Sequence, residues 1–67
     1  MIQFMFNKEV CKIDEEKSIF EYLTEKGVLD KWVAIIVDLE PISVDESKQV
    51  IIKDKMKIDI VRFVGGG

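Results

Sequence analysis

The stretch KIDIVRFVGGG, residues 57–67, contains the two features from which the fold and function are predicted. Ile58 and Ile60 alternate with charged residues, which is the pattern of a strand with one buried face. Three glycines at residues 65–67 follow this pattern directly, instead of forming a turn between two elements. We therefore predict a last strand over residues 57–63 that leads into a flexible glycine tail.

An alternating pattern also opens the chain. The hydrophobic residues Ile2, Phe4 and Phe6 occupy alternate positions, which is typical of a strand with one face toward a core. Residues 7–9 then form a turn signal, and residues 10–13 can return antiparallel to the first strand. The sequence therefore predicts an N-terminal hairpin.

The only well-signalled helix starts at Ser18. Its hydroxyl and the carboxylate of Glu21, three positions later, match the capping-box pattern. The acidic residues 14–16 beside this start favour the helix dipole, and Gly27 supplies the C-terminal stop. The face expected to pack against the rest of the protein comprises Ile19, Phe20 and Leu23.

The middle of the chain contains one strongly hydrophobic segment and several weaker signals. Residues 32–37, WVAIIV, predict a central strand that is covered, at least in part, on both faces. Trp32 is expected to lie in the core or to cover the sheet, and the alternative is an anchor for recognition of a partner. Pro41 limits residues 40–43 to a short edge segment or the start of a loop, and residues 44–49 are expected to be irregular.

The order of these elements is strand, strand, helix, strand, short strand or loop, and strand. This order predicts an α+β chain with the β-grasp (ubiquitin-like) fold, in which a mixed sheet of four to five strands packs on one main helix. The first and last strands are expected to lie side by side in the centre of the sheet and to run parallel. The folded domain is predicted over residues 1–64 and the flexible tail over residues 65–67.

Length and charge exclude several classes of protein. A chain of 67 residues has room for a single core and is expected to form one domain. Ten Lys and Arg against 13 Asp and Glu give a net charge of −3, which argues against nucleic acid as a partner. No segment approaches the roughly 20 apolar residues that a membrane-spanning helix needs, and the N-terminus lacks a signal-peptide pattern. A cytoplasmic protein without a membrane partner is predicted.

Side chains with reactive or metal-binding chemistry are sparse. Cys11 is the single cysteine, so no internal disulfide can form, and a small buried core residue is favoured over a redox thiol. The chain has no histidine, and its carboxylates show no metal-ligand spacing. The chemistry is therefore expected at the chain terminus.

The glycine tail is suited to enter another protein's active site. Because glycine has no Cβ, Gly65, Gly66 and Gly67 can pass through a channel too narrow for side chains. Four extended residues reach roughly 13 to 14 Å. A carboxylate on Gly67 presented in this way can be activated by a nucleotide and then receive sulfur or an amine. The alternative is an interaction domain of the same fold in which the glycines are incidental.

The whole chain resembles the ThiS family, the ubiquitin-like sulfur carriers of thiamine biosynthesis. The resemblance rests on the opening strand with its turn at Asn7, the helix start at residues 18–23, the strand at residues 33–37, and residues 58–67. Two turns depart from the family pattern. Asp38-Leu39 stands where the family has Asn-Gly, and Asp54-Lys55-Met56 stands where it has Asp-Gly-Asp before the last strand.

The resemblance implies a chain that is a substrate of other proteins and supplies no catalytic side chain itself. An adenylating enzyme of the ubiquitin-activating type would use ATP to adenylate Gly67, and sulfur from a partner's persulfide would convert it to a thiocarboxylate. That sulfur would pass to thiazole synthase. The free carrier is expected to be a monomer that binds no cofactor or metal. Related possibilities are a carrier for molybdenum cofactor, tungsten cofactor or cysteine synthesis, and a modifier joined through Gly67 to lysines of other proteins.

Strand alternation also places a candidate docking surface. If Ile58 and Ile60 are buried, Val61 and Phe63 face the opposite side of the sheet. Apolar side chains beside the reactive terminus are where an activating enzyme must bind, so Val61, Phe63 and Val64 are candidate docking residues. The alternative is that Phe63 folds back over the sheet edge as part of the core.

Overall fold

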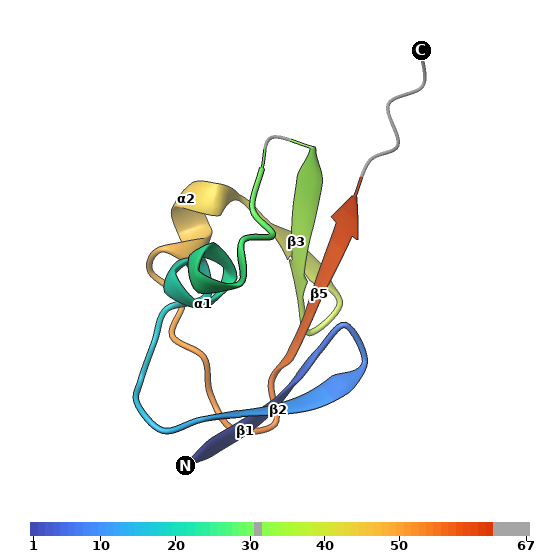
Figure 1. Cartoon of the computed structure of the whole chain (residues 1–67). Coiled ribbons are helices and arrows are strands. Elements are labelled where there is room, and N and C mark those ends of the chain that lie inside the picture. Colours follow the sequence, from blue (N-terminus) through green and yellow to red (C-terminus); the bar gives the residue numbers. More distant parts are fainter. Residues whose placement is uncertain (31, 63–67) are drawn as a thin grey trace.

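The computed structural model describes residues 1–30 and 32–62. Five strands and two helices follow one another in the order β1 (Ile2–Phe6), β2 (Glu9–Ile13), α1 (Ile19–Lys26), β3 (Val33–Val37), β4 (Glu40–Ile42), α2 (Val44–Ser47) and β5 (Lys57–Arg62). Both helices lie on one side of the sheet, as Figure 1 shows. The described part of the chain therefore has two layers.

The five strands form one mixed sheet in the order β2-β1-β5-β3-β4. Strands β1 and β5 are parallel neighbours in its centre, where Met5 pairs with Lys57 and Phe6 pairs with Ile58. Strand β3 runs antiparallel to β5, and β2 and β4 are the antiparallel edges. The predicted β-grasp arrangement, with the first and last strands side by side, is confirmed.

The core lies between α1 and the sheet. Its buried side chains come from β1, β2, α1, β3, the segment after α2, and β5: Phe4, Ile13, Ile19, Tyr22, Leu23, Ile35, Ile52 and Ile58. These residues are far apart in sequence, so their burial couples every major element to the same core.

The prediction that Phe20 belongs to the buried face of the helix is wrong. Tyr22 takes that place and is 5% exposed, because Ile19, Tyr22 and Leu23 lie at positions i, i+3 and i+4 and share one side of α1. The ring of Tyr22 packs edge-on against Phe4 at a centroid distance of 5.0 Å. Phe20 is half-buried at the side of the helix.

Helix α1 begins and ends as predicted. The hydroxyl of Ser18 accepts a hydrogen bond from the backbone N–H of Glu21 at 3.0 Å, and the carboxylate of Glu21 accepts from the N–H of Ser18 at 3.2 Å. Gly27 ends the helix in the left-handed conformation with φ +70°, which glycine adopts without a steric penalty. Local sequence therefore fixes both ends of the helix.

The prediction that residues 44–49 are irregular is also wrong, because α2 occupies the first part of this segment. Ser43 and Glu46 form a second capping box, with hydrogen bonds of 3.0 and 3.1 Å. The Ser47 hydroxyl is buried and donates to the carbonyl of Val44. A single helical turn is too short to show hydrophobic periodicity, so the capping residues were its only signal.

Two hairpins turn through pairs of residues with positive φ. Asn7 and Lys8 connect β1 to β2 with φ angles of 49° and 70°, and Asp38 and Leu39 connect β3 to β4 with 49° and 73°. Both pairs fit the tight two-residue turn that suits the twist of antiparallel strands. The departure from Asn-Gly at Asp38-Leu39 therefore leaves the β3-β4 hairpin in place.

Candidate functional site

The predicted reactive end lies outside the residues that the structure describes. Phe63, Val64 and the glycine tail of residues 65–67 follow Arg62 directly, so their roles stay predictions. The structure does show how the described chain leads up to them. Strand β5 lies in the centre of the sheet and runs parallel to β1, so its C-terminal end points away from the N-terminus (Figure 1).

An ion pair holds the end of β5 against the connection between α1 and β3. The Asp30 carboxylate accepts a hydrogen bond of 2.7 Å from the Arg62 guanidinium, and its other oxygen accepts one of 2.6 Å from the backbone N–H of Trp32. The bond from Trp32, followed by the Arg62 contact, lowers the pKa of Asp30 below its ordinary value. We call this arrangement the Asp30–Arg62 clasp.

The clasp also explains why the prediction for Trp32 is wrong. Strand β3 begins only at Val33, and the Trp32 side chain is 52% exposed rather than part of the core. Its backbone N–H bonds to the Asp30 carboxylate in the loop instead of joining the sheet ladder. An exposed aromatic residue therefore lies one residue before β3, whose Val33 pairs with the last residue of β5.

The predicted docking residue Val61 faces away from the core. Ile58 is fully buried, whereas Val61 is 44% exposed on the other face of β5. Ile60 is half-buried and packs against the core, as the alternation predicts. The exposure of Val61 is therefore consistent with a contact surface, and its role in docking stays a prediction.

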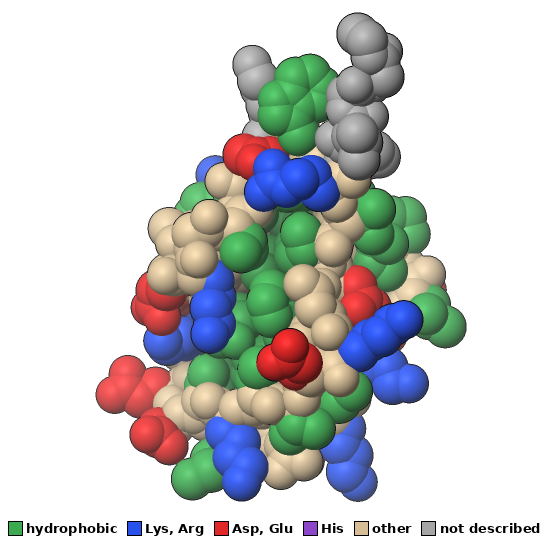
Figure 2. Space-filling view, turned by 45° about the vertical axis from the view of Figure 1, so that its right-hand side comes forward, with side chains coloured by type: hydrophobic (Ala, Val, Ile, Leu, Met, Phe, Trp, Pro, Cys, Tyr) green, Lys and Arg blue, Asp and Glu red, His purple; other side chains and the backbone are tan. Residues whose placement is uncertain are grey.

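Val61 belongs to an apolar hollow between β3, β5 and the two hairpin turns. Ile36, Leu39 and Val61 supply most of its apolar side chains, and we call these three residues the β3–β5 patch. In the antiparallel register Ile36 pairs with Asp59, two positions before Val61, so these side chains share one face. Figure 2 shows hydrophobic side chains at the surface along this flank, with acidic and basic side chains beside them.

Leu39 is the member of the patch that sequence reasoning missed. Its side chain is 85% exposed, and its φ of +73° is a conformation that a residue with a Cβ adopts at a cost of about 1–2 kcal/mol. The signal was an apolar residue at a turn position where glycine or asparagine is favoured. Ile36 was missed as well. It follows the buried Ile35 in β3, so strand alternation places its side chain on the opposite face.

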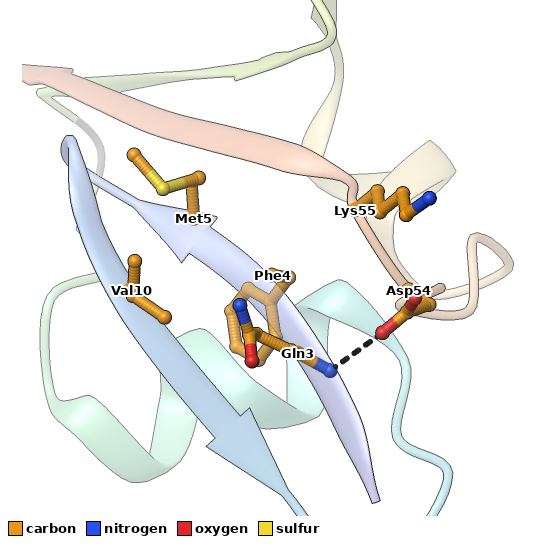
Figure 3. Close-up of a pocket in the computed structure, with 6 residues that line it drawn as sticks. All are labelled: Gln3, Phe4, Met5, Val10, Asp54 and Lys55. Atoms are coloured by element: carbon orange, nitrogen blue, oxygen red, sulfur yellow. Dashed lines mark hydrogen bonds between the residues drawn. The ribbon is translucent and has the colours of Figure 1, made fainter.

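A second hollow lies on the same face of the sheet, over β1 and β2. Its lining, drawn in Figure 3, includes Met5 and Val10 from the two strands and Asp54 and Lys55 from the turn before β5. The Asp54 carboxylate accepts a hydrogen bond of 3.0 Å from the backbone N–H of Gln3. Asp54 therefore holds the turn against β1.

Cys11 packs against the core as a small half-buried side chain. Burial raises the pKa of the Tyr22 hydroxyl, and a hydrogen bond with Cys11 raises it further. Among the described residues, no group of three or more Cys, Asp or Glu could hold a metal ion. Within the same residues, no helix is both long and apolar enough to cross a membrane.

Comparison with known proteins gives a likeness of structure. No protein-family model matches the chain, and no curated protein matches its sequence. The crystal structure of the thiamine biosynthesis protein ThiS from Geobacter metallireducens matches with a TM-score of 0.83 and 20% sequence identity, over 98% of this chain and 100% of that one. A solution structure of a thiamine biosynthesis protein from the same organism matches with a TM-score of 0.76 and 20% identity, over 98% of this chain and 88% of that one. The chain therefore has the β-grasp fold of these thiamine biosynthesis proteins.

Proposed function

We propose that this chain is a sulfur carrier of thiamine biosynthesis whose working group is the carboxylate of Gly67. The observation that carries the proposal is the combination of a ThiS-like fold over nearly the whole chain with three glycines that follow its central strand. In this fold a terminus that continues β5 starts from the central strand of the sheet, which has a partner strand on each side. The folded domain can therefore stay docked outside a partner while the terminus enters it.

The proposed reaction takes place entirely on the partner enzymes. An oxygen of the Gly67 carboxylate attacks the α-phosphorus of ATP in an adenylating enzyme of the ubiquitin-activating type, and pyrophosphate leaves. The terminal sulfur of a partner's persulfide then attacks the activated carbonyl carbon, and AMP leaves, which gives an acyl disulfide between Gly67 and the partner. A second thiol attacks the partner's own sulfur in this bond, which forms a disulfide with the partner and releases the Gly67 thiocarboxylate. The resulting thiocarboxylate donates its sulfur to thiazole synthase. The carrier supplies no catalytic side chain in this scheme.

The contribution of the folded domain is recognition. Val61, Phe63 and Val64 lie next to the glycine tail in the sequence, and the exposed Val61 extends the apolar surface of the β3–β5 patch toward the end of β5. An enzyme whose active site receives the tail can bind a surface of this kind. We propose that the adenylating enzyme binds there, in the cytoplasm.

The experiment that tests this function is intact mass spectrometry. The purified chain is incubated with ATP, a sulfur donor and an adenylating enzyme from the same genome. A mass increase equal to the exchange of one oxygen for sulfur is expected, and a variant that lacks Gly66 and Gly67 is the control. A wild-type chain that is neither adenylated nor thiolated by any adenylating enzyme of that genome would refute the proposal.

The same incubation distinguishes a thiamine carrier from a carrier of another pathway and from a protein modifier. Transfer of sulfur to thiazole synthase supports the thiamine pathway, whereas transfer only to an acceptor of molybdenum cofactor, tungsten cofactor or cysteine synthesis assigns the chain to that pathway. A remnant of Gly67 linked to lysines of other proteins would identify a modifier instead. Each outcome is read from the mass of the product that carries the sulfur or the chain.

A further inference from the structure

The two ends of β5 are held by different neighbours. Strand β1 pairs with the first two residues of β5, and the Asn7 side-chain oxygen extends this contact by accepting from the N–H of Ile60 at 2.8 Å. The pairing with β3 continues to the last residue of the strand, where Arg62 lies opposite Val33. Among the described residues, the backbone of β5 therefore ends with β3 as its ladder partner.

The Asp30–Arg62 clasp adds a second contact at this end. By strand alternation, Arg62 lies on the same face of β5 as the core residues Ile58 and Ile60, toward the helices. Its guanidinium bonds at 2.7 Å to Asp30, which is 32 positions away in the connection between α1 and β3. The other two ion pairs of the described residues lie within or beside single helices. The clasp thus joins distant segments at the point where the strand ends.

The Asp30 carboxylate is already oriented by the backbone. One of its oxygens accepts a hydrogen bond of 2.6 Å from the N–H of Trp32, two residues later, as an Asp side chain does in a turn. The other oxygen then faces the guanidinium of Arg62. A charge-assisted bond to a carboxylate held in this way restricts Arg62 more than a contact between two freely rotating side chains would.

Stability gives little reason for this ion pair, whereas direction does. The side chains of Arg62 and Asp30 are 59% and 39% exposed, and exposed ion pairs contribute little to stability. Five residues follow Arg62 in the sequence, and an extended segment of that length spans about 17 Å. A change of about 20° at the base of such a segment moves its far end by roughly 6 Å. Reacting groups must be placed within about 0.5 Å, so the direction of the strand end affects reactivity.

We propose that Asp30 and Arg62 are positioning residues, whose clasp sets the direction in which the Gly67 carboxylate is presented to the adenylating enzyme. This inference rests on the proposed function and adds to it two residues that act through the tail rather than on the reacting atoms. A tail that starts from an aimed strand end reaches the active site more often in each docked complex, which raises the rate of adenylation more than the affinity. The competing role is direct recognition, in which a carboxylate of the enzyme binds the Arg62 guanidinium.

Two substitutions break the clasp from its two sides. In Asp30→Asn the side-chain oxygen can keep the bond from the Trp32 N–H, while the amide nitrogen faces the guanidinium and cannot accept from it. Arg62→Gln removes the charge of the other partner. Glu25→Gln and Lys17→Gln are the matched controls, because they make the same changes of charge in another partly exposed ion pair, beside α1.

The measured quantity is ATP–pyrophosphate exchange by the adenylating enzyme of the same genome, over a range of carrier concentrations. Asp30→Asn and Arg62→Gln are each expected to lower kcat about three- to tenfold, with KM changed by less than about twofold. The double variant should be no worse than either single one, because both substitutions remove the same contact. The control variants should match the wild type, and all melting temperatures should stay within about 5 °C of it.

Direct recognition of Arg62 predicts a different pattern. If the enzyme binds the guanidinium itself, Arg62→Gln raises KM, whereas Asp30→Asn leaves the guanidinium available and does not lower kcat. That result would overturn the positioning role. Effects of the two substitutions that simply multiply in the double variant would also overturn it, because they would show that the two side chains act independently.

A measurement on the free chain separates this inference from the proposed function. Backbone amide NMR relaxation is expected to show greater motion of Arg62 in Asp30→Asn than in the wild type, with Ile58 at the start of the strand unchanged. Unchanged motion at Arg62 would refute the clasp as a restraint, whatever the enzyme does. If the wild type supports exchange and the clasp variants equal it, the positioning role is refuted while the carrier function stands. If the wild type supports no exchange with any adenylating enzyme of the genome, both proposals fail together.

Discussion

Replacement of Val61 by alanine tests whether the exposed face of β5 is used for docking. The substitution removes two methyl groups, which together contribute about 1.6 kcal/mol when they pass from water to a fully buried site. Val61 is already partly covered and is 44% exposed. Part of this free energy should therefore stabilise the fold, and the rest should be gained only when a partner covers the side chain.

The exposed fraction sets the size of each share. If an enzyme covers the remaining 44% of the side chain, Val61→Ala loses about 0.7 kcal/mol of binding free energy, or about threefold in Kd. The other part, at most about 0.9 kcal/mol, is lost from the free energy of unfolding. This figure is an upper bound, because an unfolded chain already buries some of its apolar surface. Addition of Phe63→Ala is expected to bring the binding loss to about 1–3 kcal/mol, as for a modest interface hot spot.

The assay is titration calorimetry of the folded variants with the adenylating enzyme, together with thermal unfolding of each variant. Val44→Ala is the control, since Val44 is 40% exposed on α2, which lies on the opposite side of the sheet. It should leave the affinity unchanged. Large destabilisation of the Val61 and Phe63 double variant, with unaltered affinity of its folded fraction, would show that these residues belong to the core and would refute the reasoning.

Three further predictions concern the tail, the clasp and the cysteine. Deletion of Gly66 and Gly67 should abolish thiocarboxylate formation with little change in melting temperature, because these residues have no side chains to pack. Gly66→Val should be nearly as damaging, since a β-branched residue stiffens the tail and cannot pass a narrow channel. Thiolation of the truncated chain, read by intact mass, would contradict this. Because the folded-state pKa of Asp30 is lowered, its carboxylate stabilises the fold above its ordinary pKa near 3.8 and loses this effect as the pH falls through the folded value. The stability difference between wild type and Asp30→Asn, from urea unfolding, should therefore shrink below about pH 4, and a constant difference between pH 7 and pH 2 would exclude the ion pair as its source. Cys11→Ala should cost about 1–2 kcal/mol of stability through lost packing and leave thiolation intact, whereas a Cys11→Ser chain that folds but cannot be loaded with sulfur would indicate a direct thiol role.

The exposed turn at Leu39 carries backbone strain that the fold tolerates. A residue with a Cβ at φ +73° costs about 1–2 kcal/mol relative to an unstrained position, a sizeable fraction of the stability expected for a small domain. The sheet tolerates this cost because the β3–β5 pairing on one side of the turn spans five residue pairs. The β3–β4 hairpin is therefore kept despite a strained residue in its turn.

The sequence by itself determined the elements whose signals are local. Alternation in β1 and β5, the capping box at Ser18 and the stop at Gly27 each depend on residues within a few positions of one another. The predicted order of elements then left few topologies, and the β-grasp sheet with β1 beside β5 was among them. For the same reason the exposed side of Val61 followed from counting along one strand.

Only the tertiary structure decided which side chains meet across the chain. Tyr22 displaced Phe20 from the core because β1 presents Phe4 and Phe6 to one side of α1, and no local pattern contains that information. The clasp between Asp30 and Arg62 joins residues that are 32 positions apart. The β3–β5 patch likewise exists because antiparallel pairing brings a turn residue, Leu39, next to the end of another strand. Contacts between distant residues depend on how the elements pack, and packing is set by the whole core at once.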